Sequence, residues 1–267
     1  MLSDEQIQLF REQGFVHGGR VLQEAQAEAL RERLTVVMAG DSAAQPDAVR
    51  NLTGDENNVV VQIVNIWEAD DLFREHLYHP IICEMVRDLM GCEVIRVWHD
   101  QVQYKPPHVG GPTTWHQDHP YWPIIQPADL VSAWVALEDA TPENGCMSMV
   151  PRSHRWGPHK NGTIGTTADF LPDPDLSLLP AGEQVHVVPC PVKAGEVLFH
   201  HCLTWHGAPP NRFKRGRPAI AVHYMPGYTR YEPSGGHLVE RHVTVQPGEE
   251  LKGQHFPTVW DHGPAPH

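Results

Sequence analysis

The sequence predicts a mainly β fold, a sandwich or barrel, with helices confined to its N-terminal part. The chain has 267 residues, which is long enough for a sizeable buried core. Its 25 prolines and 22 glycines suit a fold with many turns. Helical patterns precede Gly91, whereas short segments rich in β-branched and aromatic residues follow it. No internal repeat or linker interrupts the chain, so we expect one domain: a helical part over about 1–91, a β core over about 92–230 and a C-terminal tail over 231–267.

Three segments have the pattern of helices: residues 3–14, 22–40 and 72–91. In the first, Ser3 can act as the N-cap, and Gln6 three residues later can complete a capping box. A glycine ends each of the three segments, as is common at the C-terminal end of a helix. Residues 41–57 are polar and contain Gly, Pro and Asn, so we expect a loop there.

Short strands are expected after residue 91, in segments bounded by Pro, Gly or Asn: CEVIRVWHDQVQYK, LVSAWVALEDA, CMSMVP, EQVHVVPCPV, EVLFHHCLTWH and PAIAVHYM. Frequent short strands of this kind are typical of a sandwich or barrel. Residues 155–182 have little periodicity and many Gly, Pro and Asp. A loop of that length inside a domain is usually functional or disordered, so we expect an insertion between strands.

Composition disfavours several classes of function. The net charge of −13 argues against a nucleic-acid partner, which normally meets a basic face. The N-terminus has no signal-peptide core, and no apolar run approaches the roughly 20 residues of a membrane helix. We therefore expect a soluble, cytoplasmic protein that acts on a small molecule, as a monomer or homodimer. The scattered cysteines form no C-x-x-C pair, which fits a reducing compartment and argues against a disulfide framework or a thiolate zinc site: Cys83, Cys92, Cys146, Cys190 and Cys202.

The stretch TWHQDHPYW contains a candidate metal-binding pair. Side chains two apart in a strand project to the same face, so His116 and Asp118 point together. Fe(II) oxygenases bind their metal with two imidazoles and one carboxylate on one face. An H-x-D pattern is common, however, and by spacing alone it can equally be a hydrogen-bonded strand end.

A third ligand would come from the segment GEVLFHHCLTWHGAPPN, which offers His200, His201 and His206. Of these, His206 stands where a strand opens into a loop, directly before Gly207. Arg217 follows eleven residues after His206, at the end of the basic run RFKRGR and on the next strand or just before it. A guanidinium can hold a carboxylate with two parallel hydrogen bonds. The remaining cations of this region fit an ordinary solvated turn: Arg212, Lys214 and Arg215.

Residues 98–107, WHDQVQYKPP, place polar groups along one strand face: His99, Gln101, Gln103 and Lys105. Such a face either lines a polar cavity or belongs to an exposed edge strand. The pattern alone leaves both alternatives open.

Taken in order, the segments WHQD, AWVALEDATPENGCMSMVPRSH and GEVLFHHCLTWHGAPPN with a later arginine resemble the phytanoyl-CoA dioxygenase-like family. The resemblance extends from LSDEQIQLFREQGFV to AVHYMP, which is most of the chain. It implies a double-stranded β-helix, or jelly roll, with N-terminal helices packed on one sheet. It also implies an oxygenase that depends on Fe(II), 2-oxoglutarate and O2.

The resemblance implies roles for individual residues. His116, Asp118 and His206 match the iron ligands, and Arg217 matches the arginine that pairs with the far carboxylate of 2-oxoglutarate. Three further residues match positions beside the cosubstrate: Trp134, Gln101 and Gln62. By position, the substrate side of the metal holds His119, Tyr121 and Trp122. No catalytic residue beyond the metal centre is expected.

Two departures from the family pattern stand out. Ala208 takes the place of a serine, so one hydrogen bond near the cosubstrate is lost or replaced. Arg152 takes the place of a glycine, which puts a cation near the cavity mouth, facing either an anionic substrate or solvent.

The reaction implied is hydroxylation of a C–H bond in a small metabolite or natural-product intermediate, with release of succinate and CO2. Desaturation and ring formation are related outcomes. Asp118 argues against a halogenase, because halogenases of this kind lack the carboxylate ligand. The rival class is a cupin-like metal-binding protein or isomerase that does not use 2-oxoglutarate and would not need Arg217.

Overall fold

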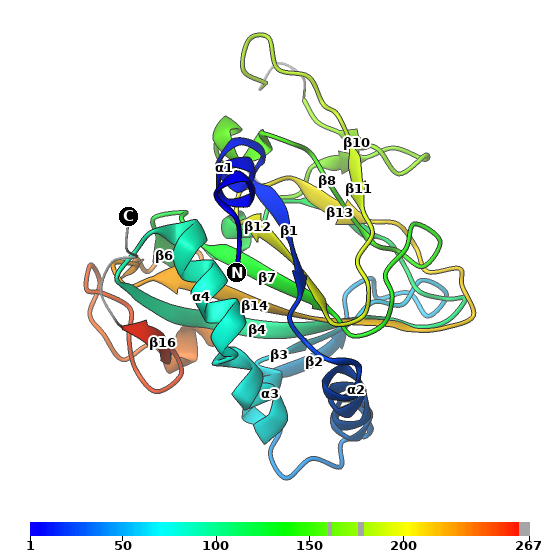
Figure 1. The fold of residues 1–267 in the computed structure, drawn as a ribbon, viewed down its shortest axis with the longest axis horizontal. Coiled ribbons are helices and arrows are strands. Elements are labelled where there is room, and N and C mark those ends of the chain that lie inside the picture. Colours follow the sequence, from blue (N-terminus) through cyan, green and yellow to red (C-terminus); the bar gives the residue numbers. More distant parts are fainter. Residues whose placement is uncertain (160–161, 176–178, 262–267) are drawn as a thin grey trace.

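A computed structural model gives the fold and describes residues 1–159, 162–175 and 179–261. Two β-sheets form its centre (Figure 1). The larger sheet has the order β1-β12-β7-β14-β4-β3-β2, with β16 also pairing with β4. Its strands are β1 (Phe15–Arg20), β2 (Ala48–Asn51), β3 (Val61–Val64), β4 (Val94–Lys105), β7 (Val131–Ala136), β12 (Glu196–His201), β14 (Arg217–Pro226) and β16 (Thr258–Asp261).

The smaller sheet has the order β11-β8-β13-β5, and all its pairs are antiparallel. Its strands are β5 (Thr113–His116), β8 (Met147–Met149), β11 (Val188–Cys190) and β13 (His206–Ala208). Two further pairs are β6 (Ile125–Gln126) with β15 (Arg230–Tyr231), and β9 (Gly165–Thr166) with β10 (Pro172–Asp173). The two main sheets form the jelly roll that the sequence predicts.

Four helices lie beside the large sheet in Figure 1: α1 (Asp4–Gln13), α2 (Glu24–Ala39), α3 (Asp71–Leu77) and α4 (Pro80–Met90). One apolar cluster joins them to it, with Leu30, Phe73 and Val86 from the helices and Val135 and Phe199 from the strands. All five side chains are buried. Alternate residues of the same strands face the opposite way, so the inner face of the sheet is free for polar groups.

The first two helices form as expected. Ser3 and Gln6 make the reciprocal capping box of α1, and Gly14 closes this helix in the left-handed conformation (φ 86°). The predicted helix over 72–91 is instead two helices, α3 and α4. Pro80 cannot donate a backbone hydrogen bond and disfavours helical geometry at His79, so the chain breaks there and restarts with Pro80 in the first turn.

The large sheet extends beyond the expected β core of 92–230. Its edge strands β1 and β2 come from the N-terminal part, and β2 lies inside the segment 41–57 that was expected to be a loop. Three of the four residues of β2 are exposed, so its composition resembles that of a loop. The position of β4 between β14 and β3 excludes the edge-strand alternative for His99 to Lys105.

The C-terminal part is packed against the core rather than forming a free tail. It contributes β16 and the 3-10 helix η5 (Leu238–His242), and it buries Val239, Leu251 and Phe256 in a second apolar cluster. Residues 262–267 lie outside the described part of the chain.

The segment expected as an insertion, 155–182, projects at the top of the view in Figure 1 and carries β9 and β10. Its residues 160–161 and 176–178 lie outside the described residues.

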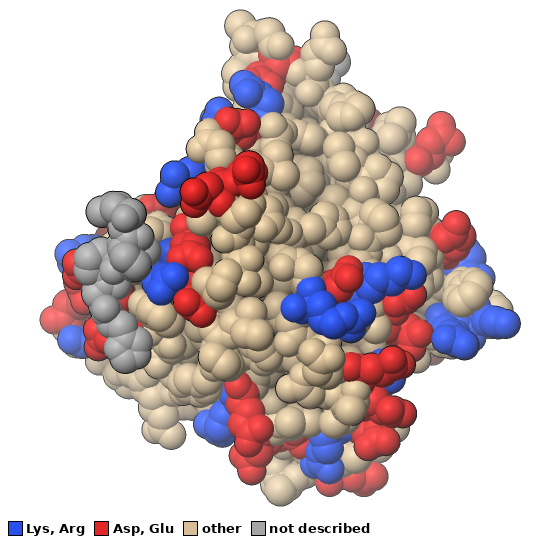
Figure 2. Space-filling model, in the orientation of Figure 1, with Lys and Arg blue, Asp and Glu red and all other residues tan. Residues whose placement is uncertain are grey.

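The described residues contain no helix with the length and apolarity that a membrane crossing requires. On the face drawn in Figure 2, Lys and Arg side chains lie beside Asp and Glu rather than forming a broad basic surface.

Candidate metal centre

Strand pairing brings the candidate ligands together. His116 ends β5 and His206 begins β13, and the antiparallel register sets these two residues opposite each other. Asp118 follows two residues after His116, just past the strand end. One oxygen of Asp118, Oδ1, is 3.6 Å from Nε2 of His116 and 3.6 Å from Nε2 of His206. The three donor atoms lie within 4.8 Å of one another, which is a spacing that one metal ion can bridge.

Both imidazoles are held from behind by backbone carbonyls. Nδ1 of His116 donates to the carbonyl oxygen of Thr114 (2.8 Å), and Nδ1 of His206 donates to that of Thr204 (2.9 Å). Each ring therefore carries a proton on Nδ1 and directs Nε2, the other nitrogen, toward Asp118. Burial and the nearby His116 lower the pKa of His206 well below its usual value, so His206 stays neutral and able to bind a metal.

The second oxygen of Asp118, Oδ2, has different neighbours. It accepts hydrogen bonds from Nε2 of His200 (3.0 Å) and from the hydroxyl of Ser132 (3.2 Å). Burial alone would raise the pKa of Asp118, but His206, His116 and His200 outweigh burial and hold that pKa well below its ordinary value. Asp118 is therefore an ionised carboxylate with one oxygen toward the candidate metal position and one fixed by the protein.

His200 and His201 thus differ in position from His206. His200 contacts the outer oxygen of Asp118. His201 is turned elsewhere, and its Nδ1 accepts a hydrogen bond from the backbone N–H of Leu203. Of the three histidines considered from the sequence, the structure brings only His206 into the cluster with His116 and Asp118.

A chain of hydrogen bonds runs from the protein surface toward Asp118. It starts at Arg50 on β2, whose Nε donates to Oε1 of Gln62 (2.7 Å). The amide nitrogen of Gln62 donates to Oε1 of Gln101, and the amide nitrogen of Gln101 lies 3.0 Å from Nε2 of His223. Strands β2, β3, β4 and β14 each supply one member of this chain.

The same chain continues from His223 to the carboxylate. Nδ1 of His223 lies 2.7 Å from the hydroxyl of Ser132, which donates to Asp118. A guanidinium only donates and a carboxylate only accepts, so every group between Arg50 and Asp118 must accept once and donate once. This requirement makes His223 a neutral imidazole with its proton on Nδ1. Burial agrees, since it lowers the pKa of His223 to about 4.

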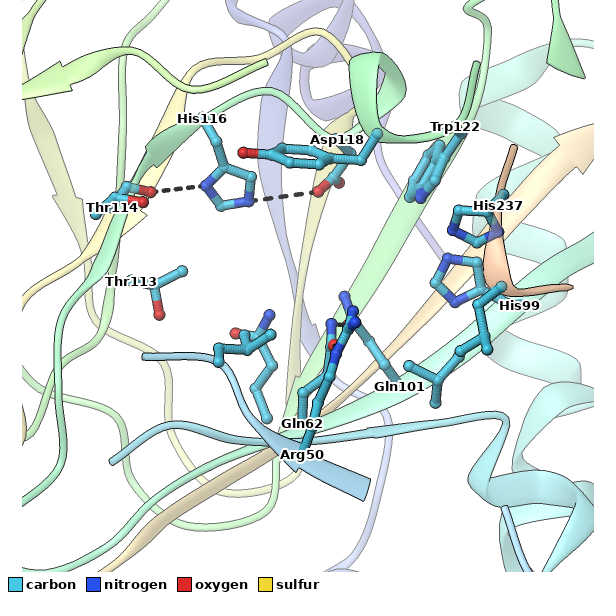
Figure 3. A pocket seen from close by; sticks show the side chains of 15 residues that line it. Arg50, Gln62, His99, Gln101, Thr113, Thr114, His116, Asp118, Trp122 and His237 are labelled. Atoms are coloured by element: carbon cyan, nitrogen blue, oxygen red, sulfur yellow. Dashed lines mark hydrogen bonds and ion pairs between the residues drawn. The ribbon is translucent and has the colours of Figure 1, made fainter. Parts of the chain in front are cut away.

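An outer cavity of about 330 Å³ opens onto the candidate metal position (Figure 3). Gln101, His116 and Asp118 line it together with an aromatic wall. In that wall the rings of His99 and Trp122 meet edge to face at 5.5 Å, and the rings of His99 and His237 stack at 5.7 Å. Other lining residues include Arg50, Leu52, Gln62, Tyr121 and Leu238.

A narrower inner cavity continues behind the triad and shares Gln101, His116 and Asp118 with the outer one. Trp134 lines it, and the guanidinium carbon of Arg217 is 5.3 Å from the centre of the Trp134 ring. Arg217 is only 1% exposed, and its Nε and Nη1 have no hydrogen-bond partner. Burial lowers its pKa to about 10, so it remains a cation at neutral pH. A buried, partly unsatisfied cation next to a cavity is a binding position for an anion.

Two residues expected on the substrate side lie elsewhere. His119 is buried, with Nε2 donating to the carbonyl oxygen of Ile125 (3.0 Å), and it lines neither cavity. Arg152 has positive φ (69°) and directs its guanidinium to Glu183 (2.6 Å) instead of the cavity. Arg217 lines neither cavity itself but lies against Trp134, which lines the inner one. The remaining expected residues each line a cavity: Trp134, Gln101, Gln62, Tyr121 and Trp122.

Sequence reasoning missed Ser132, His223, Arg50 and His237. The two-residue period of a strand could have found two of them. Ser132 lies two residues before Trp134 on β7, and His223 shares the inner face of β14 with Arg217, six residues earlier. Arg50 and His237 carry no such signal.

Comparisons with known proteins show the family of this chain. The family model described as "Phytanoyl-CoA dioxygenase (PhyH)" matches residues 10–219. A "Probable phytanoyl-CoA dioxygenase" of Caenorhabditis elegans is 32% identical over 169 residues, which are 58% of this chain and 52% of that protein. The chain thus spans about half the length of such curated relatives.

Two solved structures have the same fold. The "non-heme alpha ketoglutarate dependent carbocyclase SnoK from nogalamycin biosynthesis" is 31% identical, with 96% of both chains covered and a TM-score of 0.80. The "epimerase SnoN in complex with Fe3+, alpha ketoglutarate and nogalamycin RO" is 22% identical, covers 96% of this chain and 98% of its own, and has a TM-score of 0.75. This second likeness bears on the fold alone.

Proposed function

Since the chain belongs to the phytanoyl-CoA dioxygenase family, we propose that it oxidises a C–H bond of a small molecule with 2-oxoglutarate and O2 as cosubstrates. The expected cofactors, Fe(II), 2-oxoglutarate and O2, are those of this family. One observation carries the proposal: a His-Asp-His cluster and Trp134 line one inner cavity, and an unsatisfied buried arginine, Arg217, lies against the Trp134 ring.

The cluster fits Fe(II). Two imidazoles and one ionised carboxylate would occupy one face of an octahedral ion and leave the other positions open. We assign His116, Asp118 and His206 as the ligands. When bound, the metal supplies the oxidative decarboxylation of 2-oxoglutarate to succinate and CO2, and the oxidation of the substrate.

The inner cavity fits the cosubstrate. Arg217 offers unused N–H donors, and a carboxylate would satisfy them with paired, charge-assisted hydrogen bonds. Trp134 supplies a flat wall of the inner cavity, and its ring also contacts the Arg217 guanidinium. Gln101 lies on the boundary of both cavities, and Gln62 orients it through their shared hydrogen bond. These features support binding of a keto diacid between the metal and Arg217.

The outer cavity is the position that we assign to the substrate, with Tyr121 and Trp122 in its wall. Hydroxylation is the reaction that we propose first. The carbocyclase at 31% identity makes ring closure the second candidate, because both outcomes begin with the oxidation of a C–H bond. A small metabolite or natural-product intermediate is the substrate class. We do not assign His119 or Arg152 to it, because neither reaches this cavity.

The rival functions fit the residues less well. A cupin-like protein or isomerase without 2-oxoglutarate would leave Arg217 buried with no anion to satisfy it. A halogenase would need a free position where Asp118 stands. All five cysteines are free, which supports a cytoplasmic enzyme in a reducing compartment.

The test is turnover of 2-oxoglutarate to succinate by the Fe(II)-loaded protein, run against a panel of metabolites. We expect slow succinate release without substrate and faster release with a cognate compound, whose product mass then separates hydroxylation from ring closure. Metal-dependent activity on any compound that proceeds without 2-oxoglutarate would support the rival class instead.

A further inference from the structure

A second group of imidazole and carboxylate side chains lies outside the site described above. Glu68 ends the 3-10 helix η1 (Ile66–Glu68), His242 ends η5, and His255 precedes β16. One donor atom from each lies within 4.8 Å of the others, the same criterion that the His116 cluster meets. Among the residues that the structure describes, only these two groups satisfy it. Three separate parts of the chain therefore converge on one point.

The side chains of this group lie in direct contact. Nδ1 of His255 is 2.6 Å from Oε1 of Glu68. The ring centroids of His242 and His255 are 3.9 Å apart, and the ring planes differ by 20°. Side-chain exposure ranges from 14% for His242 to 31% for His255, with Glu68 at 20%. The group is thus partly shielded from water, yet open enough for an ion to enter.

Asp47 supports the group from outside. Its carboxylate lies 2.9 Å from Nε2 of His242, and it also accepts hydrogen bonds from the side chains of Asn65 (2.9 Å) and Arg241. A metal-binding imidazole commonly has its other nitrogen held by a carboxylate, which fixes the ring and makes it a better ligand. Because Asp47 holds Nε2, Nδ1 is the nitrogen that His242 would offer to a metal.

We propose that Glu68, His242 and His255 form a second metal site, which takes a divalent transition ion of the zinc type, with Asp47 as the outer partner of His242. Two imidazoles and a carboxylate suit Zn²⁺ or Co²⁺, whereas Mg²⁺ and Ca²⁺ prefer oxygen ligands alone. The ion has a structural role, because the site lies apart from both cavities that adjoin His116 and Asp118.

The position of this site in the fold shows which parts of the chain a bound metal would connect. His237 and Leu238, at the start of η5, line the outer cavity, and the same 3-10 helix ends at His242. Asp47, which holds His242, directly precedes β2, and β2 carries the cavity residue Arg50. A metal bound here ties the C-terminal segment to η1 and holds that wall of the outer cavity beside β2. The oxygenase function could fail while this site remains, since the two share no ligand.

The experiment counts metal with the full chain. Chelator-treated protein is titrated with Zn²⁺ in competition with a chromophoric chelator, and with Co²⁺ while its visible absorption is followed. We expect two equivalents for the wild type. Glu68→Gln and His242→Ala should each lose one equivalent. Asp47→Asn should weaken metal binding at the second site by about 10- to 100-fold, because Asp47 only holds the ring of His242. His186→Ala removes an exposed histidine and serves as the matched control, which should keep both equivalents.

Glu68→Gln keeps a hydrogen-bonding side chain of the same shape, so its loss of metal cannot be attributed to a hole in the structure. Asp118→Ala separates the two sites: it should lose the equivalent bound by His116 and His206 and retain the one bound by His242. Zn²⁺ should also raise the melting temperature of Asp118→Ala but not that of Asp118→Ala combined with His242→Ala. A wild-type protein that binds one equivalent, lost in Asp118→Ala and kept in His242→Ala, overturns the second site and leaves the proposed function intact. The reverse pattern overturns the ligand set proposed for iron.

Discussion

The two oxygens of Asp118 divide the candidate centre into a metal-facing half and a protein-facing half. Oδ1 is equally far from the two candidate ligand imidazoles, whereas Oδ2 is held by His200 and Ser132. Fixing the outer oxygen limits rotation of the carboxylate, so the orientation needed for a metal exists before the metal binds. Mutation of a residue should therefore weaken metal binding more, the closer that residue lies to the candidate metal position.

The first prediction concerns the effect of these residues on Fe(II) binding. His206→Ala should abolish Fe(II) binding and activity, because it removes a ligand. Ser132→Ala and His200→Ala should weaken Fe(II) binding by about 10- to 100-fold, because they release only the outer oxygen of Asp118. His201→Ala should have a smaller effect on the metal. The measurement is Fe(II) affinity by anaerobic titration of each variant. Normal iron binding by His206→Ala together with its loss in His201→Ala would show that the ligand assignment is wrong.

The second prediction concerns Arg217. Breaking a buried ion pair costs roughly 3–5 kcal/mol, and about 1.4 kcal/mol corresponds to tenfold in affinity. Arg217→Leu should thus weaken 2-oxoglutarate binding by about two to three orders of magnitude and leave Fe(II) binding nearly unchanged. Arg217→Lys should recover only part, because an ammonium lacks the planar fork of a guanidinium. The measurement is titration of the metal-to-ligand absorption band under anaerobic conditions.

Arg215→Leu is the control for Arg217→Leu. Arg215 is exposed, and its guanidinium is 3.3 Å from Glu138 in a surface ion pair. Such pairs contribute little to stability, so this variant should bind 2-oxoglutarate as the wild type does. Equal losses in both variants would refute the cosubstrate position proposed beside Trp134.

At the scale of elements, the end of α1 supports the strand that carries His206. The carbonyl oxygen of Gly14 accepts hydrogen bonds from the backbone N–H of His201 (2.8 Å) and the hydroxyl of Thr204 (2.8 Å). The carbonyl of Thr204 in turn holds His206 through Nδ1. The N-terminal helix therefore fixes the turn between β12 and β13, which explains how a distant segment influences the centre.

The third prediction tests this contact with two glycines that both end helices at positive φ. Gly14→Ala would place a Cβ 2.4 Å from Nδ1 of His154 and 2.6 Å from Oγ1 of Thr204, whereas a Cβ at Gly40 would meet nothing within 4 Å. Both variants carry the backbone strain of about 1–2 kcal/mol. Only Gly14→Ala adds crowding, of about 1–3 kcal/mol. Urea denaturation should show the larger loss for Gly14→Ala, with weaker Fe(II) binding as well. Equal losses for the two would show that the contact is unimportant.

At the scale of the whole molecule, buried histidines should make the protein sensitive to acid. Burial lowers the pKa of His76 and of His201 to about 3, against 6.5 for a free histidine. Between these values the unfolded chain binds a proton that the folded chain does not. Stability is therefore complete above pH 6.5 and falls as the pH is lowered toward 3.

The fourth prediction follows from this proton uptake. At pH 5.5, one unit below 6.5, each such histidine should lower the free energy of unfolding by about 1.4 kcal/mol relative to pH 8. The phenylalanine of His76→Phe would stay buried and cannot be protonated. In this variant, the difference in the free energy of unfolding between pH 8 and pH 5.5 should therefore be smaller by about 1.4 kcal/mol. The measurement is urea denaturation of metal-free protein at both pH values. If the free energy of unfolding of His76→Phe changed between the two pH values as much as that of the wild type, His76 would not contribute to the acid sensitivity.

Features that depend on neighbours along the chain can be read from the order of the amino acids. The capping box of α1 and the polar face from His99 to Lys105 follow from local sequence pattern. The H-x-D spacing also keeps Asp118 near His116, although β5 ends at His116 and Asp118 has helical backbone angles. The order of the motifs was sufficient to identify the family and its jelly roll. These signals are readable because side-chain direction repeats every two residues in a strand and every 3.6 in a helix.

Contacts between distant segments are not readable from local sequence and follow from how the whole chain folds. The register of β13 on β5 brought His206, and neither His200 nor His201, beside His116. Packing across five strands connected Arg50 to Asp118, and the C-terminal segment became a wall of the outer cavity. Local pattern indicates which face of an element is polar, but not which other element covers it. That choice comes from the burial of apolar surface and the pairing of backbone hydrogen bonds over the whole chain.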